Sequence, residues 1–534
     1  MIRITNIRLP FDHQPWEIRK AAAKKIGFPE DRIQSLAIQR RSLDARRDRP
    51  LRRVYSVLIV VEGEESLASL VDKSPDLTFW QTQAYTRPEA GVPKEQDRPL
   101  IIGSGPAGMF AGLILAEAGL NPVILERGKP VQLRTKDVNL FWMKGVLDHE
   151  SNVQFGEGGA GTFSDGKLTT RVKDKHSRSQ KILQEMVDAG APPEILIESR
   201  PHVGTANLVR VVKNLRNRIE KLGGEYRFES RVDDLTLDSN RVTGITLSSG
   251  ERIPAAIVVL AIGHSARDTF SMLYNNGVKI APKPFSMGFR IEHAQRAVDQ
   301  NQYGDHAGHP LLPAADYQLS YRTSLGRTVY SFCMCPGGFV IGAASENETV
   351  VTNGMSQYAR AGENANSAIV AEVAPADFLG LPLEGLKYQH LWEKKAFSLG
   401  GGDYYAPVQL VEDFLKGQPS VQLNKVQPTY RPGVKLVDLN RGLPPTIIAA
   451  IKEALPVFNR WIPGFSGPDA IFTGVETRTS CPLRILRDKD GQSVSIKGLY
   501  PAGEGSGYSG GIMSSAIDGI ICAERILLRI QQSA

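Results

Sequence analysis

The sequence predicts an α/β fold in which a discontinuous Rossmann-like domain carries two further parts, a small N-terminal ferredoxin-like α+β domain and an inserted mixed α+β domain. Two observations predict the discontinuous core. Residues 99–127 contain an uninterrupted strand–turn–helix–strand unit with three glycines at its turn. Residues 499–528, near the other end of the chain, repeat the order strand, glycine-rich turn and helix. Because both blocks are expected in one sheet, the residues between them include an insertion.

The first unit begins with a short apolar strand, Leu100–Ile102, followed by Gly103, Gly105 and Gly108 in the spacing G-x-G-x-x-G. Gly103 allows the chain to turn sharply, Gly105 lets a pyrophosphate approach the backbone, and Gly108 lets the next helix pack closely on the strand. The N–H groups at the start of that helix attract phosphate. A crossover that binds nothing would not need three glycines at this spacing, so we expect a dinucleotide here.

An acidic residue ends the second strand of this unit, where dinucleotide-binding folds place a ribose-binding carboxylate. The strand is Pro122–Leu125 and the acid is Glu126. A carboxylate at this position accepts hydrogen bonds from both ribose hydroxyls and repels a 2′-phosphate. Arg127 and Arg134 follow, and an arginine just past the ribose-binding acid can reach the pyrophosphate or cover the adenine.

The residues that precede this unit predict a separate domain of the ferredoxin-like type, residues 1–98. Strand and helix patterns occur in the order βαββαβ, at residues 2–9, 15–26, 35–43, 54–61, 64–71 and 77–84. A proline-containing linker, Arg87–Arg98, joins this domain to the first glycine-rich unit.

An arginine-rich hairpin is expected between the two middle strands of that domain. It carries seven arginines against two aspartates, a local charge of +5, namely Arg40, Arg41, Arg46, Arg47, Arg49, Arg52 and Arg53 with Asp44 and Asp48. Such a cluster is compatible with phosphate or RNA binding. Few aromatic residues lie among the arginines to stack on bases, so the pattern favours a solvated hairpin over a nucleic-acid partner.

Composition narrows the class of protein. The chain has 534 residues, 41% hydrophobic and 23% charged, with a net charge of +7, as is typical of a globular protein in solution. No apolar run reaches the ~18 residues that a bilayer span requires, and no signal-peptide segment is present. The four cysteines form no C-x-x-C pair, so we expect neither a metal site nor a thioredoxin-like disulfide. We therefore expect a cytoplasmic protein without a membrane partner, of undetermined oligomeric state.

A second glycine-rich loop occupies residues 152–171, with the sequence NVQFGEGGAGTFSDGKLTTR. It also contains G-x-G-x-x-G, but no apolar strand precedes it and no amphipathic helix follows it, so we do not interpret it as a second dinucleotide turn. A loop of this composition can form a backbone wall against a flat ring or a pyrophosphate. Its candidates for cofactor contacts are Gly159, Gly161, Thr162, Phe163 and Ser164.

A further strand returns to the sheet near residue 260. The apolar run Ala255–Ala261 leads into Ile262, Gly263 and His264, which matches the second flavoprotein signature, in which the chain passes beneath the cofactor. We expect Ala261 and Gly263 to contact the cofactor. For His264 a capping or loop role is favoured over a catalytic one.

Residues 276–460 break the nucleotide-fold pattern and predict an inserted substrate domain of mixed strands and helices. Cys333 and Cys335 lie in one of its strands, within the sequence CMCPGG. At a period of two residues both thiols would lie on one face of that strand, where burial as small apolar side chains is favoured. Both are weaker candidates for catalysis.

The C-terminal block distinguishes between possible dinucleotides. A strand at 499–502 ends at the turn Gly503–Gly505, and Gly510 and Ile512 open a long helix. Glu504 in the turn is suited to a ribitol hydroxyl. The N–H groups at the start of the helix lie where the O2/N1 edge of a flavin needs donors. Simple NAD enzymes have no such closing block, so we expect non-covalently bound FAD, with NAD(P)H only as a possible transient donor. The predicted FAD-binding domain comprises residues 99–275 and 461–534.

The chain resembles the two-dinucleotide-binding-fold flavoproteins, and more narrowly it is similar to an uncharacterised FAD-dependent dehydrogenase family of bacteria and plastids. The resemblance is carried by SLDAR (42–46), GSGPAGMF (103–110), NVQFGEGGAGTFSDGKL (152–168), AIGHSARD (261–268), VETRTSCP (475–482) and YPAGEGSGYSGGIMSSAIDGI (500–520). The family carries no settled substrate. For the cofactor, the resemblance together with these motifs implies contacts from Gly103, Gly105, Pro106, Ala107, Gly108, Glu126, Arg127, Arg134, Gly159, Gly161, Thr162, Phe163, Ser164, Val232, Ala261, Gly263, Gly503, Glu504, Gly510, Gly511 and Ile512.

The expected function is that of an FAD-dependent oxidoreductase that transfers hydride between flavin N5 and an unidentified small organic substrate. Such a reaction needs positive charge for a substrate carboxylate or a developing oxyanion. Arg478, just before the closing strand, is the candidate for that charge, and an ion pair with Glu476 or with the flavin phosphates is its structural alternative. Two other classes stay open, a flavin-dependent RNA-modifying enzyme and a flavin-bound interaction or sensor protein without turnover.

Overall fold

The N-terminal domain has the expected βαββαβ order. The computed structural model describes residues 1–89 and 98–533, and residues 90–97 of the predicted linker lie outside that part of the chain. An antiparallel sheet with strand order β2-β3-β1-β4 buries its apolar face against α1. The elements are β1 (Ile2–Pro10), α1 (Trp16–Ile26), β2 (Ile33–Asp44), β3 (Arg52–Val61), α2 (Ala68–Lys73) and β4 (Leu77–Phe79).

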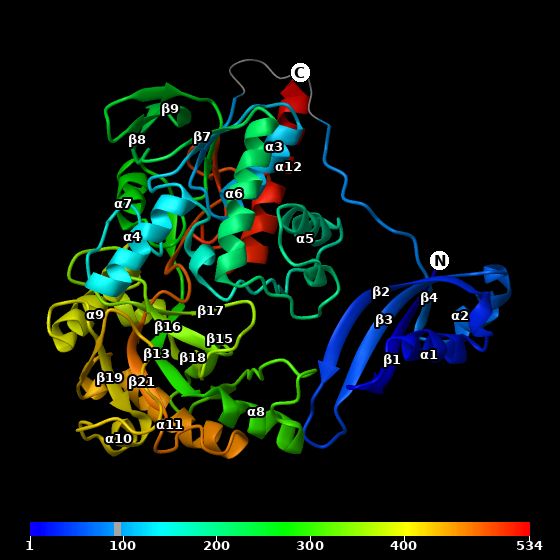
Figure 1. Ribbon diagram of the computed structural model, residues 1–534. Coiled ribbons are helices and arrows are strands. Elements are labelled where there is room, and N and C mark those ends of the chain that lie inside the picture. Colours follow the sequence, from blue (N-terminus) through cyan, green and yellow to red (C-terminus); the bar gives the residue numbers. More distant parts are fainter. Residues whose placement is uncertain (90–97, 534) are drawn as a thin grey trace.

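The arginine-rich hairpin is formed by the joined ends of β2 and β3, and it docks on the rest of the chain (Figure 1). Arg41 N–H donates to Ile197 O at 2.6 Å, and Ser199 N–H donates to Arg41 O at 2.9 Å. Three apolar side chains of the hairpin also pack against a cluster that includes Met334 of the inserted domain, namely Leu43, Ala45 and Leu51. The hairpin therefore contacts both larger parts of the molecule.

A five-stranded parallel sheet with order β23-β11-β5-β6-β7 forms the central domain. Its second strand, β11, pairs with both β5 and β23, so strands from opposite ends of the sequence lie in one sheet. This is the discontinuous arrangement that the two glycine-rich blocks predict. The strands are β5 (Leu100–Ile102), β6 (Val123–Leu125), β7 (Glu225–Arg227), β11 (Val258–Leu260) and β23 (Leu499–Pro501).

Two layers cover this sheet, because successive side chains of a strand face opposite sides. Ile101, Ile124 and Val259 face a helical layer in which α3 packs on α12 (Figure 1). The helices of that layer are α3 (Pro106–Glu117), α5 (Arg178–Asp188), α6 (Thr205–Lys221) and α12 (Ile512–Ser533). Leu100 and Leu260 face the other layer, which contains β8 (Val232–Asp238), β9 (Arg241–Leu247), β10 (Arg252–Pro254) and α7 (Arg267–Asn275).

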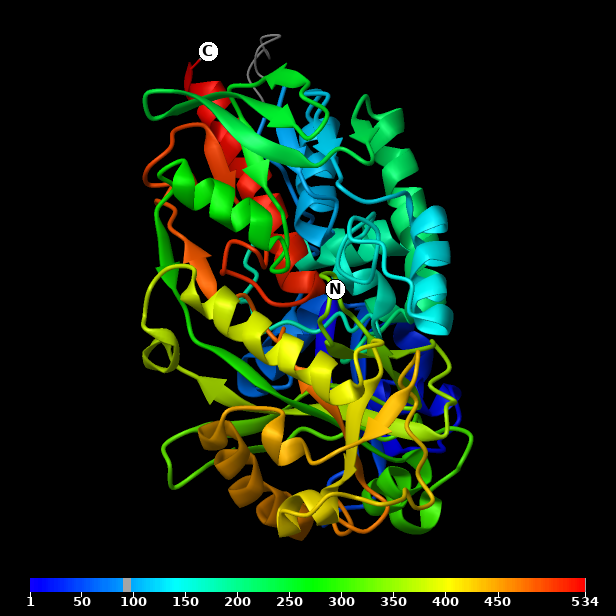
Figure 2. The same ribbon diagram turned by 90° about the vertical axis from the view of Figure 1, so that its left-hand side faces the viewer.

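The inserted domain is built on a seven-stranded sheet with order β14-β15-β18-β13-β21-β19-β20. Figure 2 shows it as the lower half of the molecule. Helix α11 (Pro445–Trp461) packs its apolar face on this sheet through side chains such as Ile447, Ile451 and Phe458. The strands are β13 (Phe285–Ala294), β14 (Ser320–Arg322), β15 (Thr328–Cys335), β18 (Asn364–Val373), β19 (Ala406–Leu410), β20 (Val434–Leu436) and β21 (Ile471–Glu476). Because β21 follows residue 460, this sheet extends past the predicted end of the insertion, and the domain boundaries stay predictions.

The remaining described helices and strands connect these parts. They are β12 (Ile280–Pro282) paired with β22 (Leu483–Ile485), β16 (Gly338–Gly342) paired with β17 (Thr352–Ser356), and α4 (Val131–Lys144), α8 (Gln295–Tyr303), α9 (Glu384–Gly400) and α10 (Val411–Lys416). Short 3-10 turns lie at Glu30–Arg32, Glu64–Leu67, Ala160–Phe163, Pro193–Leu196, Gly304–His306, Pro375–Phe378 and Leu439–Arg441. Among the described residues, no helix has both the length and the apolar character needed to cross a membrane.

Candidate cofactor and active site

A cavity of about 390 Å³ lies where the carboxyl ends of β5, β11 and β23 meet the inserted domain. Ligands of open parallel sheets bind at this edge, outside the carboxyl ends of the strands. The central domain contributes the turn after β5, the glycine-rich loop at 154–167 and the segments after β11 and β23. The inserted domain contributes Phe332, Cys333 and Asn353, and the segment after β21 contributes Arg478 and Thr479.

Most residues predicted to contact a cofactor line this cavity. They are Gly103, Gly105, Pro106, Ala107, Glu126, Arg127, Gly159, Gly161, Ser164, Val232, Ala261, Gly263, Gly503, Glu504, Gly510, Gly511 and Ile512. Four of the predicted residues do not line it, namely Gly108, Arg134, Thr162 and Phe163. The sequence motifs therefore bring together residues from both ends of the chain, and the four exceptions have structural partners instead.

The three glycines of the first turn serve different purposes. Gly103 has φ +101°, and a Cβ on it would overlap Ala261 O, while a Cβ on Gly108 would overlap Gly103 O. These two glycines are required by the fold itself. Gly105 has φ −71°, and a Cβ there would meet only Gly159 Cα, at 3.8 Å. Gly105 thus leaves open space at the start of α3, a cradle that fits a pyrophosphate.

The acid after β6 is held by the protein. Glu126 is 4% exposed, and its Oε2 accepts hydrogen bonds from Ser104 N (3.0 Å) and Ser104 Oγ (2.6 Å). Its Oε1 accepts from Gly128 N (2.9 Å) and Gly156 N (3.0 Å). One carboxylate therefore joins three loops around the cavity, and a ribose hydroxyl would share oxygens that already accept four bonds. The adjacent Arg127 also lines the cavity and pairs with Glu150 at 2.6 Å.

Arg134 organises the glycine-rich loop from behind. Its guanidinium is fully buried and donates five hydrogen bonds of 2.7–3.2 Å to backbone carbonyls of the loop, those of residues 152, 153, 156, 157 and 159. Burial lowers the pKa of Arg134 to about 10, so it stays charged at neutral pH. Phe163 packs under this guanidinium, and Thr162 Oγ1 donates to Glu157 O at 3.4 Å. The loop turns its carbonyls toward Arg134, which is why Arg134 supports the wall and does not line the cavity.

The closing block supplies the opposite wall. Gly503 N–H donates to Asp518 Oδ2 at 2.8 Å, which ties the turn after β23 to α12. Glu504 lines the cavity and lies 2.7 Å from His264 Nδ1. The other ring nitrogen, His264 Nε2, is buried and has no hydrogen-bond partner among the described residues, although His264 lines the cavity. A polar group of the cofactor would satisfy it, which fits a ligand at this wall.

The first residues of α12 leave space for a ligand. A Cβ on Gly510 or Gly511 would have no neighbour within 4 Å among the described residues, and both glycines line the cavity. A Cβ on Gly161 would approach Ile512 Cγ1 at 3.0 Å, so the glycine-rich loop and the closing helix lie against each other. The unpaired N–H groups at a helix start are the donors expected for a flavin edge.

Arg478 lines the cavity, but its charge is balanced by the protein. Its Nη2 lies 2.8 Å from Glu393 Oε2 and 3.3 Å from Glu346 Oε2, and its Nη1 donates to Ser345 Oγ at 2.7 Å. Arg267 pairs with the same two glutamates. The predicted ion pair between Arg478 and Glu476 is wrong: Glu476 pairs with Arg290, and Arg478 pairs with Glu393. Its role toward a substrate stays a prediction.

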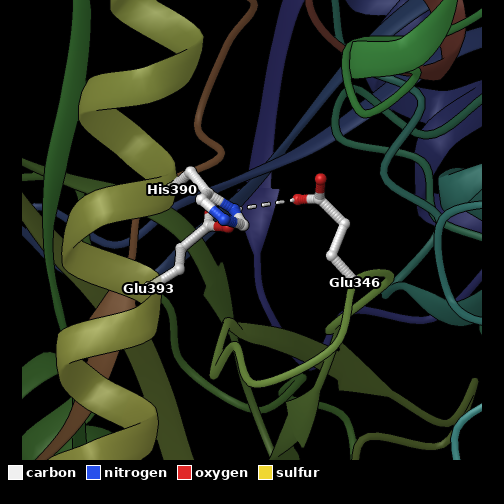
Figure 3. A group of neighbouring side chains, drawn as sticks. All are labelled: Glu346, His390 and Glu393. Atoms are coloured by element: carbon white, nitrogen blue, oxygen red, sulfur yellow. Dashed lines mark ion pairs between the residues drawn. The ribbon is translucent and has the colours of Figure 1, made fainter.

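The acids of this network lie close enough to a histidine to resemble a metal site. Figure 3 shows Glu346, His390 and Glu393 converging from two segments of the inserted domain. Burial alone would raise the pKa of Glu393, but Arg267 and Arg478 hold it well below its ordinary value. Two arginines thus balance the two carboxylates, which removes the negative charge that a divalent cation would need.

The two cysteines of β15 have different surroundings, although a regular strand would place both side chains on one face. Cys335 is fully buried, as expected, whereas Cys333 is partly exposed and lines the cavity. The pairing of β15 with β18 shifts register between Phe332 and Cys335, so the period of two residues does not hold there. A β-bulge of this kind re-aims a side chain, and the sequence carries no turn residue that would have revealed it.

Much of the charge of the arginine-rich hairpin is used in local contacts. Arg46 pairs with Asp44 at 2.6 Å, Arg41 pairs with Glu198, and Arg53 Nη2 donates to Leu311 O at 2.6 Å. The Arg46–Asp44 pair lies within the hairpin, whereas the contacts of Arg41 and Arg53 hold the hairpin on the rest of the chain.

Comparison with known families gives three matches along the chain. Residues 98–263 match an FAD binding domain, residues 284–479 match the family described as FAD-dependent protein, C-terminal domain-like, and residues 1–60 match a domain of unknown function. An uncharacterised protein of Clostridium beijerinckii is 46% identical over 528 residues, which cover 98% of each chain.

Solved structures with a related arrangement are distant in sequence. A variant of E. coli quinol fumarate reductase FrdA is 13% identical, with 82% of this chain and 71% of that chain covered, at a TM-score of 0.37. The flavin-dependent brominase Bmp2 is 13% identical, with coverages of 82% and 79% and a TM-score of 0.38. A 3-ketosteroid-delta4-(5alpha)-dehydrogenase of Rhodococcus jostii is 16% identical, with coverages of 83% and 99% and a TM-score of 0.33. Likeness at these TM-scores carries no argument about the reaction.

Proposed function

The chain belongs to one family with the uncharacterised Clostridium beijerinckii protein, and it carries an FAD binding domain and an FAD-dependent C-terminal domain. We propose that it is an oxidoreductase that transfers hydride between flavin N5 and a small organic substrate. Its cofactor is FAD. One observation supports a reaction as opposed to cofactor storage. Residues of the dinucleotide turn and side chains from outside the central domain line the same cavity, so a substrate held by the latter would lie beside the cofactor. Bound FAD supplies a ring that accepts or donates hydride.

We propose that the cavity holds FAD with its phosphates at the start of α3, where Gly105 leaves space and the helix N-terminus attracts negative charge. Val232 would meet the adenine through its backbone, and Glu504, oriented by His264, would accept a ribitol hydroxyl. The start of α12 at Gly510 would donate to the flavin edge. These roles assign FAD binding to residues 99–275 and 461–534 together.

The inserted domain and the segment after β21 would form the substrate side of the cavity. Asn353 Oδ1 accepts hydrogen bonds from Arg290 Nη2 (3.2 Å) and Gly354 N (2.7 Å), so its amide NH₂ group is the part available to a substrate oxygen. Thr479 Oγ1 donates to Ser286 O at 2.8 Å, which fixes the wall beside Arg478. A rigid wall of this kind orients a substrate and excludes water from the ring.

A nicotinamide cofactor would act only as a transient hydride donor. The described chain has one turn of the dinucleotide type, and the loop at 152–171 is a wall of the FAD cavity. NAD(P)H would therefore enter from the substrate side. The Arg41–Glu198 pair and the hydrogen bond from Arg53 to Leu311 O give the hairpin a structural role, and no contact favours the RNA-modifying alternative.

The test is anaerobic reduction of the FAD-loaded protein. NADH, NADPH and a panel of small organic acids, amines and alcohols are added in turn, and the flavin absorbance is followed. We expect at least one donor to bleach the flavin, and Asn353→Ala to raise the donor concentration needed without loss of FAD. Asn301→Ala, on α8 and outside the cavity lining, is the matched control. A flavin that dithionite bleaches but no donor reduces would favour a flavin-bound protein without turnover.

A further inference from the structure

Two cysteines of the inserted domain lie together at the cavity wall. Cys333 lines the cavity and has φ +44°, a left-handed backbone conformation that is rare for a residue with a side chain. Cys335 is fully buried behind it, and Cys335 Sγ donates to Cys333 O at 3.3 Å. Between them, Met334 packs into the cluster beneath the N-terminal hairpin. Backbone conformations of this kind persist where surrounding contacts impose them, and they gather at functional sites.

Two cations hold this segment. Arg290 Nη1 donates to Cys333 O at 2.8 Å, and Lys167 Nζ donates to Met334 O. The acids that face the same cations are Glu476, 2.9 Å from Arg290 Nε, and Asp165, 3.5 Å from Lys167 Nζ. Lys167 also lines the cavity, so a cation lies beside Cys333 on the cofactor side.

These surroundings shift the pKa values of the two thiols in opposite directions. The neighbouring Cys335 thiol, Lys167 and Arg290 hold the pKa of Cys333 well below its ordinary value against the effect of burial. The neighbouring Cys333 side chain and burial raise the pKa of Cys335. By contrast, burial raises the pKa of both Cys481 and Cys522 to about 12. A cavity-facing cysteine with a lowered pKa and a second thiol beside it differs from these two buried cysteines, because a lowered pKa favours the reactive thiolate.

We propose that Cys333 and Cys335 form a redox-active dithiol that exchanges an electron pair with FAD across the cavity wall. The proposal rests on the proposed placement of the flavin ring between the start of α12 and the part of the cavity wall that contains Cys333. It goes further, because it gives the protein a second two-electron centre that none of the matched families describes.

The Cys333 thiolate and the Cys335 thiol join in one S–S bond, and the S–H bond of Cys335 breaks. Two electrons and that proton pass to oxidised FAD, which becomes the reduced, singly protonated anion. The dithiol is oxidised and FAD is reduced, and the total charge is unchanged. In the reverse direction reduced flavin returns two electrons and one proton to the disulfide, the S–S bond breaks, and the Cys333 thiolate and the Cys335 thiol are restored.

The test is an anaerobic titration of the air-oxidised, FAD-loaded protein with dithionite, with electrons counted per FAD. We expect four electrons for the wild type, two for the flavin and two for the disulfide. Cys333→Ser and Cys335→Ser should each take up two, while the control Cys481→Ser should take up four. A wild-type uptake of two electrons would overturn the proposal.

A thiol count in the unmodified protein keeps the proposal testable if a variant fails to fold. After denaturation, the air-oxidised chain should react with a thiol reagent at two cysteines, and the reduced chain at all four. Four reactive thiols in the air-oxidised chain would refute the dithiol. That outcome is distinct from failure of the proposed function, in which no hydride donor reduces the flavin whatever the state of the thiols.

Discussion

Replacing Gly105 with valine should remove FAD while the protein stays folded. The backbone there has φ −71° and ψ −177°, which valine adopts, and a Cβ meets only Gly159 Cα, at 3.8 Å. As an N-cap residue valine is poor, and we expect folding to lose about 1 kcal/mol. The loss in binding is larger, because the side chain fills the space proposed for the pyrophosphate. We expect the affinity for FAD to fall at least ~100-fold, which is about 2.8 kcal/mol.

The assay compares flavin content and thermal unfolding of the two proteins. At FAD concentrations ~100 times the wild-type Kd, the wild type should gain about 2.7 kcal/mol of stability, and Gly105→Val should gain at most about 0.4 kcal/mol while keeping a native circular dichroism spectrum. Gly108→Val is the contrasting control, because its Cβ would overlap Gly103 O and the chain should fail to fold with or without FAD. A folded Gly105→Val protein with a full complement of FAD would refute the reasoning.

Three further predictions concern the C-terminal residues, the buried Glu393 carboxylate and the Arg478 guanidinium. Removal of residues 499–534 takes away β23 and α12, so FAD binding should be lost, and a truncated chain that still binds FAD would contradict the discontinuous domain. Glu393→Gln leaves Arg267 and Arg478 without this buried counter-charge, and the free energy of unfolding should fall by about 3–5 kcal/mol, with no comparable change in the exposed control Glu412→Gln. Burial alone would raise the pKa of Glu393, but the two arginines depress it below the value in the unfolded chain. The ionised Glu393 carboxylate therefore stabilises the folded protein fully at neutral pH, and this stabilisation is lost as the pH falls below about 4. Urea unfolding at several pH values should show this loss in the wild type and not in Glu393→Gln. Arg478→Ala should slow flavin reduction at subsaturating donor by about 10-fold or more, if Arg478 binds a substrate anion, while Arg478→Lys retains part of the rate. An unchanged rate in FAD-loaded Arg478→Ala would assign the anion site to the inserted domain.

The central sheet was predictable because its signals are local. Three glycines at fixed spacing, an acid at the end of the next strand and a glycine-rich turn before the last helix each follow from the backbone needs of one short segment. The structure adds that Gly103 and Gly108 serve the fold and Gly105 serves the ligand. That division depends on Ala261 and on Gly159, which lie far along the chain and which no local pattern identifies.

The charged residues were harder to assign, because their partners come from distant segments. Arg134 follows the predicted ribose-binding acid, which is the pattern of a pyrophosphate or adenine contact, yet its guanidinium binds backbone carbonyls of the glycine-rich loop. Arg478 finds Glu393 on α9, eighty-five positions earlier in the chain, and not its near neighbour Glu476, which Arg290 occupies. A charge in a sequence indicates that a partner is needed, and only the tertiary fold decides which partner it finds.

The most direct test of the account is an experimentally determined structure of the FAD-loaded protein. We expect the pyrophosphate at the start of α3 beside Gly105, the adenine near Val232, and the flavin ring between the start of α12 and the wall that contains Cys333 and Asn353. The reactive edge of the ring should face the inserted domain. FAD bound in the opposite direction, or outside this cavity, would contradict the proposed site and the reaction assigned to it.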